Sequence, residues 1–323
     1  MNTRVGVLIN GASGRGNGKG HALARQLGGA AEIDLQVLAE FSALPQTLRH
    51  FAQNQITDLF ISSGDGTVQA VMTHIAESGQ WSSMPRLCIL PHGTTNLSAD
   101  DIGFTAKSII QQAQFIKTMP PAEVKTRHTL HVLNPKTGGP RHGLTIGAGA
   151  AANATRHAQN AFNNKGVRGA YATFATIVSG FGKAALKPAT PGQKARIDCP
   201  CAMRFETSGK ILADGLQVFF IATTLNRLFF NARPFWGRQS GPIRASSFAY
   251  PVANVWRWGL PMMYGSETRR PPPGATSFSG TEFSITCAEP YVMDGEFFEG
   301  QENQPLRVVL GPAFTFIIGP ARP

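Results

Sequence analysis

The sequence predicts two domains, a doubly wound α/β domain at the N-terminus and a mostly β domain after it. Over the first 120 residues, short apolar runs alternate with segments of helical periodicity, as in a parallel sheet covered by helices. After Pro120 and Pro121 the alternation stops, and strand-like runs separated by Gly- and Pro-rich turns follow.

The expected elements follow in chain order. In the first domain we expect strands at Val5–Ile9, Ile33–Leu38, Asp58–Ile61 and Leu87–Leu90, and helices from about Lys19 and over Pro45–Gln53, Thr67–Ala76 and Ala106–Lys117. In the second we expect strands at Thr129–Leu133, Leu216–Thr223, Phe283–Cys287 and Arg307–Val309, and one helix at Gly169–Phe181.

Composition and charge narrow the class of protein. Of 323 residues, 42% are hydrophobic and only 15% charged, which excludes a disordered chain. Thirty Lys and Arg against 19 Asp and Glu give a net charge of +11, which favours a polyanionic partner: nucleic acid, an acidic membrane or a phosphorylated ligand. The charge is uneven, because Val124–Ile197 contains no acidic residue. The second domain therefore carries the positive field, although basic faces are often simply solvated.

The cysteines and apolar segments point to an intracellular protein. Four cysteines in this length provide no disulfide framework and no zinc-finger spacing, so we expect reduced thiols. The start of the chain lacks the pattern of a secretory signal, because a short strand runs into a glycine-rich loop. The C-terminal apolar window Val308–Ala321 is too short to span a bilayer. We expect a cytoplasmic protein.

Three glycine-rich loops follow the predicted parallel strands, where such sheets bind ligands. The first, Asn10–Gly20, resembles a phosphate-binding turn but matches neither the P-loop nor the G-x-G-x-x-G pattern. The second, Ser62–Thr67, places Asp65 between two glycines, where a carboxylate suits a metal or a proton. The third, Leu90–Asn96, offers hydroxyls and an amide, and we interpret its His92 as a packing or hydrogen-bonding residue. Each loop alone could be a simple connector.

Taken together, the loops are specific. The order Asn-x-x-Ser-Gly, Ser-Gly-Asp-Gly-Thr and Pro-x-Gly-Thr-Thr-Asn, followed by Asp294-Gly295-Glu296, resembles the diacylglycerol kinase catalytic domain family, which includes bacterial lipid kinases and sphingosine kinases. The resemblance implies a Rossmann-like domain over residues 1–122, completed by a C-terminal strand at about 304–323, and a β-sandwich lipid-substrate domain over 123–303. It also implies ATP, Mg²⁺ and a lipid hydroxyl as phosphoryl acceptor.

The resemblance assigns roles to individual residues. Asp65 would act in catalysis and in the magnesium network, and Glu296 would be the general base. The other nucleotide-binding residues would be Asn10, Ser13, Gly14, Gly64, Gly66, Thr67, Gly93, Thr94, Thr95 and Asn96. A competing interpretation of Asp294-Gly295-Glu296 is a plain hairpin turn, since Asp-Gly is a common two-residue loop.

Several positions depart from the family pattern. Gln69-Ala70 replaces an Asn-Glu pair, Leu97 and Lys125 stand near expected aspartates, and Gly147–Ala150 and Pro242–Ser246 replace two acidic elements. Asp100 or Asp101 could substitute locally. The leading hypothesis is therefore an ATP-dependent lipid kinase. Its alternatives are a soluble kinase related to NAD kinases, and a pseudokinase that binds lipid or nucleotide without transferring phosphate.

A basic and aromatic segment, Arg227–Arg244, suggests where such a protein would meet its substrate. Arginines beside Phe and Trp suit an anionic membrane interface, and they also suit single-stranded nucleic acid. Because no nucleic-acid motif is present, we expect peripheral membrane association and no nucleic-acid partner. The same aromatic residues could instead belong to the core of the second domain.

Overall fold

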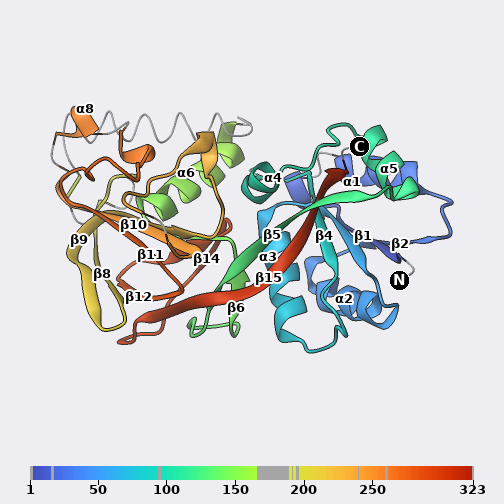
Figure 1. Cartoon of the computed structure of the whole chain (residues 1–323), viewed down its shortest axis with the longest axis horizontal. Coiled ribbons are helices and arrows are strands. Elements are labelled where there is room, and N and C mark those ends of the chain that lie inside the picture. Colours follow the sequence, from blue (N-terminus) through green and yellow to red (C-terminus); the bar gives the residue numbers. More distant parts are fainter. Residues whose placement is uncertain are drawn as a thin grey trace. The chain divides into compact units, whose positions relative to one another are not determined.

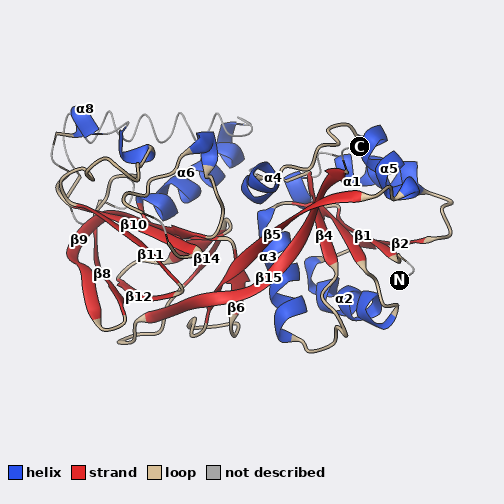
Figure 2. Cartoon of the chain, viewed as in Figure 1, coloured by secondary structure: helices blue, strands red, loops and turns tan. Residues whose placement is uncertain are grey.

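The fold was analysed in a computed structural model that describes residues 3–15, 18–93, 96–165, 189–190, 192–193, 196–238, 240–252, 254–258 and 261–321. Backbone contacts divide the chain into two compact units. Unit 1 comprises Met1–Thr129 with Pro312–Pro323, and unit 2 comprises Leu130–Gly311. Strands and helices alternate in unit 1, whereas strands dominate unit 2 (Figures 1 and 2). The predicted fold class, an α/β domain followed by a mostly β one, is confirmed.

Unit 1 is built on a parallel sheet with the strand order β15-β4-β3-β1-β2. Its strands alternate with helices, as the sequence predicts. The elements are β1 (Val5–Asn10), α1 (Lys19–Leu27), β2 (Ile33–Leu38), α2 (Leu44–Gln53), β3 (Asp58–Ser63), α3 (Asp65–Glu77), β4 (Arg86–Pro91), α4 (Leu97–Ile102), α5 (Ile109–Thr118) and the end of β15 (Leu306–Pro320). The central strands β1, β3 and β4 are almost wholly buried because both faces of the sheet are covered.

Two helices of unit 1 differ from expectation. α5 begins at Ile109 rather than Ala106, because Ser108 and Gln111 form a reciprocal capping box that fixes the first turn. α4 is absent from the helices expected from the sequence. It has six residues, too few for a periodic pattern to identify.

Unit 2 is a mainly antiparallel sheet with the order β14-β13-β7-β9-β8-β12-β15, and β10 and β11 extend from β9. It contains more strands than the sequence revealed. The elements are β5 (Ala122–Val132), β6 (Arg141–Gly143), β7 (Thr145–Gly149), α6 (Ala150–Lys165), β8 (Cys201–Thr207), β9 (Lys210–Thr223), β10 (Ile243–Ala249), α8 (Val255–Trp258), β11 (Ala275–Gly280), β12 (Glu282–Cys287), β13 (Tyr291–Met293), β14 (Glu296–Phe298) and β15. β5 and β15 are shared by the two units, since each passes a boundary between them.

The predicted helix at Gly169–Phe181 lies outside the described residues. α6 was not predicted, because its residues are mainly alanine and asparagine and show no stripe of large apolar side chains. The apolar window Val308–Ala321 falls almost entirely within strand β15. Among the described residues, no helix is long and apolar enough to cross a membrane.

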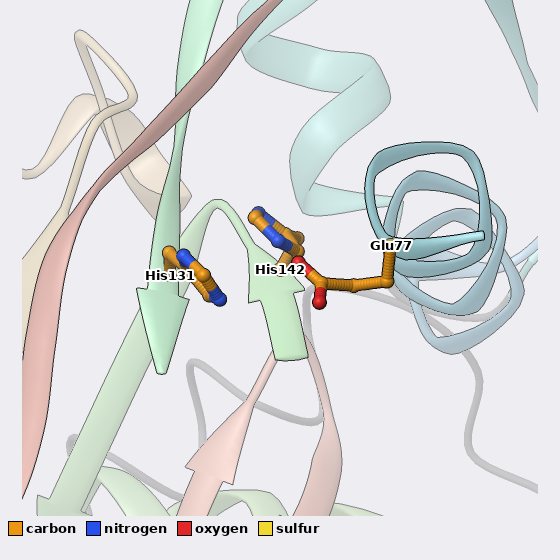
Figure 3. A group of neighbouring side chains, drawn as sticks. All are labelled: Glu77, His131 and His142. Atoms are coloured by element: carbon orange, nitrogen blue, oxygen red, sulfur yellow. The ribbon is translucent and has the colours of Figure 1, made fainter. Parts of the chain in front are cut away.

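The core of unit 2 is aromatic. Phe205 meets Phe220, Phe278 and Phe283 with ring centroids 5.2–5.8 Å apart in edge-on geometry. On the paired strands β5 and β6, His131 lies opposite His142, and their rings stack with centroids 4.1 Å apart (Figure 3).

Candidate functional site

The three glycine-rich loops of unit 1 come together at one edge of the parallel sheet. Ile9 of β1 pairs with Ser62 of β3, and Ser63 pairs with Pro91 of β4, so all three strands end at the same level. The loops then touch. A Cβ atom added to Gly93 would lie 2.3 Å from the Cα of Gly64, closer than any side chain allows. Glycine is therefore required where the second and third loops cross.

The first loop joins this contact through two residues. A Cβ atom on Gly64 would lie 3.4 Å from the Ser13 hydroxyl oxygen. The Asn10 side-chain amide donates a hydrogen bond of 3.0 Å to the hydroxyl of Thr67, which is buried in the first turn of α3. Gly14 adopts a positive φ of 57°. Thus Asn10, Ser13, Gly14, Gly64 and Thr67 form one continuous backbone-rich surface.

That surface includes the N-terminus of α3. Gly64 is its N-cap residue and has no side chain, so the first-turn N–H groups receive no side-chain cap. A helix N-terminus with glycine on the approach favours an anion, through its N–H groups and the helix dipole. Gly66, in the first turn, keeps that approach open. The arrangement fits the phosphate tail of a nucleotide.

The third loop is held by its own asparagine. The Asn96 side chain accepts a hydrogen bond from the Gly93 N–H at 2.8 Å and donates one to the Gly93 carbonyl at 3.0 Å. Asn96 also takes the left-handed conformation, with φ of 54°, which asparagine tolerates well. Thr94 and Thr95, predicted to bind the nucleotide, lie outside the described residues.

Asp65 makes a contact that the sequence did not reveal. Its two carboxylate oxygens accept hydrogen bonds from the Leu97 N–H at 3.1 Å and the Ser98 N–H at 3.0 Å, in the first turn of α4. Burial raises the pKa of Asp65, and these N–H bonds only partly oppose that shift. Asp65 therefore caps α4 with the carboxylate that the resemblance assigned to magnesium.

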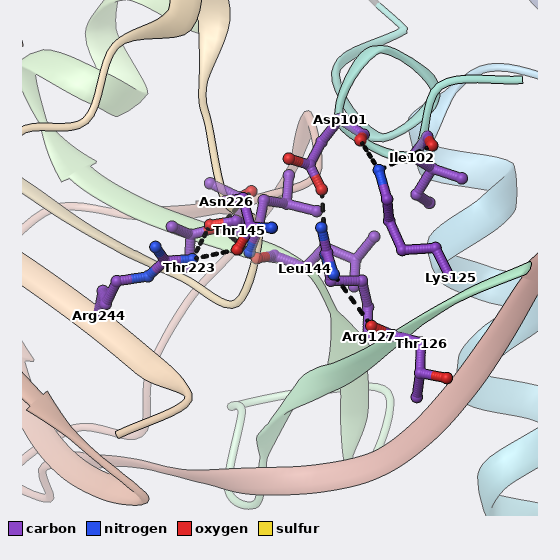
Figure 4. Close-up of polar contacts among 11 residues, drawn as sticks. Asp101, Ile102, Lys125, Thr126, Arg127, Leu144, Thr145, Thr223, Asn226 and Arg244 are labelled. Atoms are coloured by element: carbon purple, nitrogen blue, oxygen red, sulfur yellow. Dashed lines mark hydrogen bonds and ion pairs between the residues drawn. The ribbon is translucent and has the colours of Figure 1, made fainter. Parts of the chain in front are cut away.

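The other end of α4 is held by two basic residues (Figure 4). The Lys125 ammonium donates to the carbonyls of Asp101 and Ile102, at 2.8 and 3.0 Å. Arg127 forms an ion pair of 3.1 Å with the buried Asp101 carboxylate. An acid at the N-terminus and a base at the C-terminus match the helix dipole. Asp101 is thus committed to an arginine, which weakens its candidacy as a substitute metal ligand.

The described part of unit 1 offers no cluster of neighbouring ligands around Asp65 for the magnesium ion that the resemblance implies. Within the described part of unit 1, no three His, Cys, Asp or Glu side chains bring ligand atoms within 4.8 Å of one another. Both Asp65 oxygens already accept N–H bonds. The metal role of Asp65 stays a prediction without support from the geometry.

His92 is a buried, neutral residue of the third loop. Its Nδ1 lies 2.8 Å from the Ser62 hydroxyl and its Nε2 lies 2.9 Å from the Gln112 side-chain oxygen. Because that oxygen accepts, Nε2 carries the proton and Nδ1 accepts from Ser62. Burial lowers the pKa of His92 to about 4. The ring therefore connects β3, β4 and α5 rather than serving as a base.

Glu296 lies in a β-hairpin of unit 2. β13 and β14 are joined by Asp294 and Gly295, both with positive φ, as in a type I′ turn, and Glu296 pairs with Met293. The hairpin interpretation of this motif is therefore correct for its backbone. Glu296 is exposed and Asp294 is buried. Whether Glu296 reaches the loops of unit 1 stays a prediction.

The buried Asp294 ties the hairpin to β7. Its two oxygens accept hydrogen bonds from the N–H groups of Leu144 and Thr145, at 2.8 and 2.9 Å. A Cβ atom on Gly143 would lie 2.7 Å from the same carboxylate, so glycine is needed beside it.

A buried arginine occupies the strand where the family pattern has an acidic element. Arg244 of β10 is only 8% exposed; its guanidinium donates to the Leu225 carbonyl and lies 3.3 Å from the Asn226 side-chain oxygen (Figure 4). It also lies over the Phe235 ring, 5.8 Å from its centroid. The acidic element is thus replaced by a cation held within unit 2.

The basic and aromatic segment separates into two parts. Phe235 and Trp236 are 6% exposed, and Trp236 packs in a cluster with Phe248. Arg233 and Arg238 are exposed. The suggestion that Phe235 and Trp236 face a membrane is therefore wrong, because the interior of unit 2 buries both rings, whereas Arg233 and Arg238 are available to a partner.

The family model of the diacylglycerol kinase catalytic domain matches residues 4–126, which confirms the resemblance seen in the loops. The chain is similar to a solved structure of a putative diacylglycerol kinase from Bacillus anthracis str. Sterne, with 14% identity, a TM-score of 0.67, and 99% of each chain covered. It is also similar to a diacylglycerol kinase structure from that organism, with 13% identity, a TM-score of 0.62, and coverage of 99% of this chain and 98% of the other. No curated protein sequence matches significantly.

Proposed function

We propose that this chain, whose residues 4–126 belong to the diacylglycerol kinase catalytic domain family, transfers the γ-phosphoryl group of ATP to the hydroxyl of a lipid. The acceptor would be a diacylglycerol or a sphingoid-type lipid at the cytoplasmic surface of a membrane. The observation that carries the proposal is the convergence of the three glycine-rich loops at the uncapped N-terminus of α3.

ATP would be held mainly by backbone groups. The N–H groups at the start of α3 and the surrounding glycines would receive the phosphates, with Asn10, Ser13 and Asn96 supplying polar side chains. Phosphoryl transfer requires chiefly positioning and charge stabilisation, so a rigid, glycine-lined surface suits it. The structural tie between Asp65 and α4 would keep this surface in place.

The resemblance implies that Glu296 takes the proton from the hydroxyl of the lipid acceptor. An exposed carboxylate on a tight hairpin could accept the hydroxyl proton if it reaches the γ-phosphate. Glu296→Gln should then preserve ATP affinity and reduce turnover by about two to four decades. Glu299→Gln, an exposed acid one residue beyond β14, is the matched control. Equal turnover in both variants would remove Glu296 from the mechanism.

A substitution of Asp65 tests the proposed role of the glycine-rich loops in ATP binding and phosphoryl transfer. If its charge contributes to transfer, Asp65→Asn should lower turnover by about two decades or more. Calorimetry of ATP binding with and without Mg²⁺, on wild type and variant, separates a metal role from a structural one. A turnover within threefold of wild type would exclude Asp65 from catalysis.

Membrane association is proposed through the exposed arginines. Replacing Arg233 and Arg238 with Glu should weaken binding to anionic vesicles by several kcal/mol at low salt, at about 1 kcal/mol per basic residue plus the added repulsion. Lys210 and Arg307, exposed elsewhere in unit 2, provide a control with the same charge change. Unchanged co-sedimentation of the Arg233/Arg238 variant, or an equal loss in the control, would contradict a specific surface.

A second candidate is a binding module that retains the loops without transferring phosphate. It is favoured by the hydrogen bonds that hold Asp65 at α4, by the ion pair of Asp101 with Arg127, and by the buried Arg244 in place of an acidic element. The decisive experiment incubates the protein with labelled ATP and a panel of diacylglycerol, sphingosine and ceramide. ATP or lipid binding without labelled product would establish the module instead of the kinase.

A further inference from the structure

Two thiols of unit 2 face each other across neighbouring strands. The Sγ atoms of Cys201, at the start of β8, and Cys287, at the end of β12, lie 3.5 Å apart. β8 and β12 are antiparallel, and Cys287 pairs with Met203, two residues from Cys201 along the same strand. The cysteines are therefore diagonal neighbours on one face of the sheet. Both belong to the four cysteines that the structure shows as free thiols.

The two thiols have different surroundings. Cys201 is 7% exposed, whereas Cys287 is more accessible. Cys201 also borders a small cavity together with Cys199, Arg156 and Glu289. Cys287 is therefore the more accessible thiol, and the more deeply buried Cys201 lies next to it.

The hydrogen bond between the thiols makes them chemically unequal. The hydrogen bond with Cys201 lowers the pKa of Cys287, although burial opposes the shift. The same bond and burial raise the pKa of Cys201. Because the thiolate is the reactive form of cysteine, Cys287 is the better nucleophile and Cys201 the better resolving partner.

We propose that Cys201 and Cys287 form a reversible disulfide when the protein meets a peroxide. The Cys287 thiolate attacks one peroxide oxygen: an S–O bond forms, the O–O bond breaks, and the departing hydroxide takes a proton to become water. Cys201 then attacks the Cys287 sulfur: the S–S bond forms, the S–O bond breaks, and the Cys201 proton leaves with hydroxide as a second water. Two thiols lose two electrons, and one peroxide is reduced to two waters.

The bond requires a modest movement, since the sulfurs must approach from 3.5 Å to about 2.05 Å. It would join two strands that already pair, and it would fix the end of β12 just before the chain continues to β13. The alternative pair, Cys199 and Cys201, is separated by one proline. Cys199 instead directs its thiol to the carbonyls of Thr190 and Pro200 at 3.8 Å.

The test uses the wild-type protein. It is treated with hydrogen peroxide, alkylated, digested without reduction and analysed by mass spectrometry. The expected product is a cross-linked peptide pair containing Cys201 and Cys287, with Cys88 and Cys199 alkylated after unfolding, and dithiothreitol should restore four thiols. Recovery of Cys201 as a free thiol while Cys287 is oxidised to sulfinic acid would overturn the proposal. So would a Cys199–Cys201 disulfide as the main product.

Serine variants assign the order of events. Cys201→Ser should accumulate a Cys287 sulfenic acid that a cyclic diketone traps, because the resolving thiol is gone. Cys287→Ser should show no rapid loss of thiols, and Cys199→Ser is the matched control and should form the disulfide at the wild-type rate. Thiol loss at an unchanged rate in Cys287→Ser would also overturn the proposal.

Discussion

Asp65 in unit 1 and Asp294 in unit 2 make the same kind of contact in different settings. Each precedes a glycine, and each accepts hydrogen bonds from two consecutive backbone N–H groups distant in sequence. Asp294 is buried in a hairpin turn and ties it to β7. Asp65 is less buried, caps a short helix, and lies where three glycine-rich loops meet.

The N–H bonds of Asp65 compensate only part of the cost of burying its carboxylate. The pKa of Asp65 is raised, so its two N–H bonds do not offset the cost of burying the carboxylate. A carboxylate retained for stability alone would be better compensated. A raised carboxylate pKa agrees with the role proposed for Asp65, whereas Asp294 links the hairpin to β7.

The largest expected effect is the loss of the Asp294 tie. Asp294→Ala removes two hydrogen bonds to a buried charge and should lower the unfolding free energy of unit 2 by about 3–5 kcal/mol. Urea unfolding measures the change, and hydrogen exchange over residues 141–149 locates it. Asp214→Ala, an exposed acid of the same unit, should change stability by less than about 0.5 kcal/mol. A loss below 1 kcal/mol for Asp294→Ala would show that its two hydrogen bonds contribute little to the stability of unit 2.

His92 gives unit 1 a pH dependence of opposite sign to that of Asp65. With its pKa lowered to about 4 in the fold, His92 is neutral there while the unfolded chain gains a proton below pH 6.5. Stability is therefore complete above pH 6.5 and falls by up to about 3 kcal/mol as the pH drops to 4.

The matching variant is His92→Gln, which has no proton to gain in this window. Its unfolding free energy should fall less than that of wild type between pH 6.5 and 4. Asp65, whose pKa is raised, acts in the other direction, because its contribution is lost as the pH rises above 3.8. Parallel pH profiles for wild type and His92→Gln would show that the ring is not held neutral.

Lys125 tests the opposite end of the helix that Asp65 caps. Lys125→Met keeps most of the aliphatic stem but loses the bonds to the carbonyls of Asp101 and Ile102, and should cost about 1 kcal/mol. Lys117→Met, at an exposed site in the last turn of α5, is the control. Equal urea midpoints for both variants would mean that α4 does not depend on this cap.

The smallest stability effect is expected for Asp65→Asn. The variant keeps one oxygen for the N–H groups of α4 and removes a charge that burial disfavours, so its unfolding free energy should stay within about 1 kcal/mol of wild type. Asp294→Asn should lose more, because its site is more deeply buried. Equal losses in urea unfolding would show that both aspartates are purely structural.

Much of unit 1 could be predicted from the sequence because its signals are local. The strand Ile33–Leu38 and the helix beginning at Lys19 follow from apolar periodicity and glycine punctuation. The loops could be located for the same reason, since each follows a buried strand.

What could not be predicted depends on distant partners. Nothing near Asp65 in the sequence identifies Leu97 and Ser98 as its hydrogen-bond donors, 32 and 33 residues away. The burial of Phe235 and Trp236 could not be predicted either. A segment of basic and aromatic residues has the same composition at a protein surface and at the edge of a core. β8 was missed because, apart from Phe205 and Thr207, its residues are not the β-branched and aromatic types that mark a strand.

The shared strand β15 has a consequence for the order in which the protein is made. The sheet of unit 1 gains this strand beside β4, at Phe316 opposite Leu87, and Phe314, Phe316 and Ile317 are fully buried. A ribosome has therefore completed all of unit 2 before it supplies the residues that close the core of unit 1. Until residues 312–317 emerge, β4 is an open sheet edge, the kind of surface that chaperones protect and that aggregation exploits.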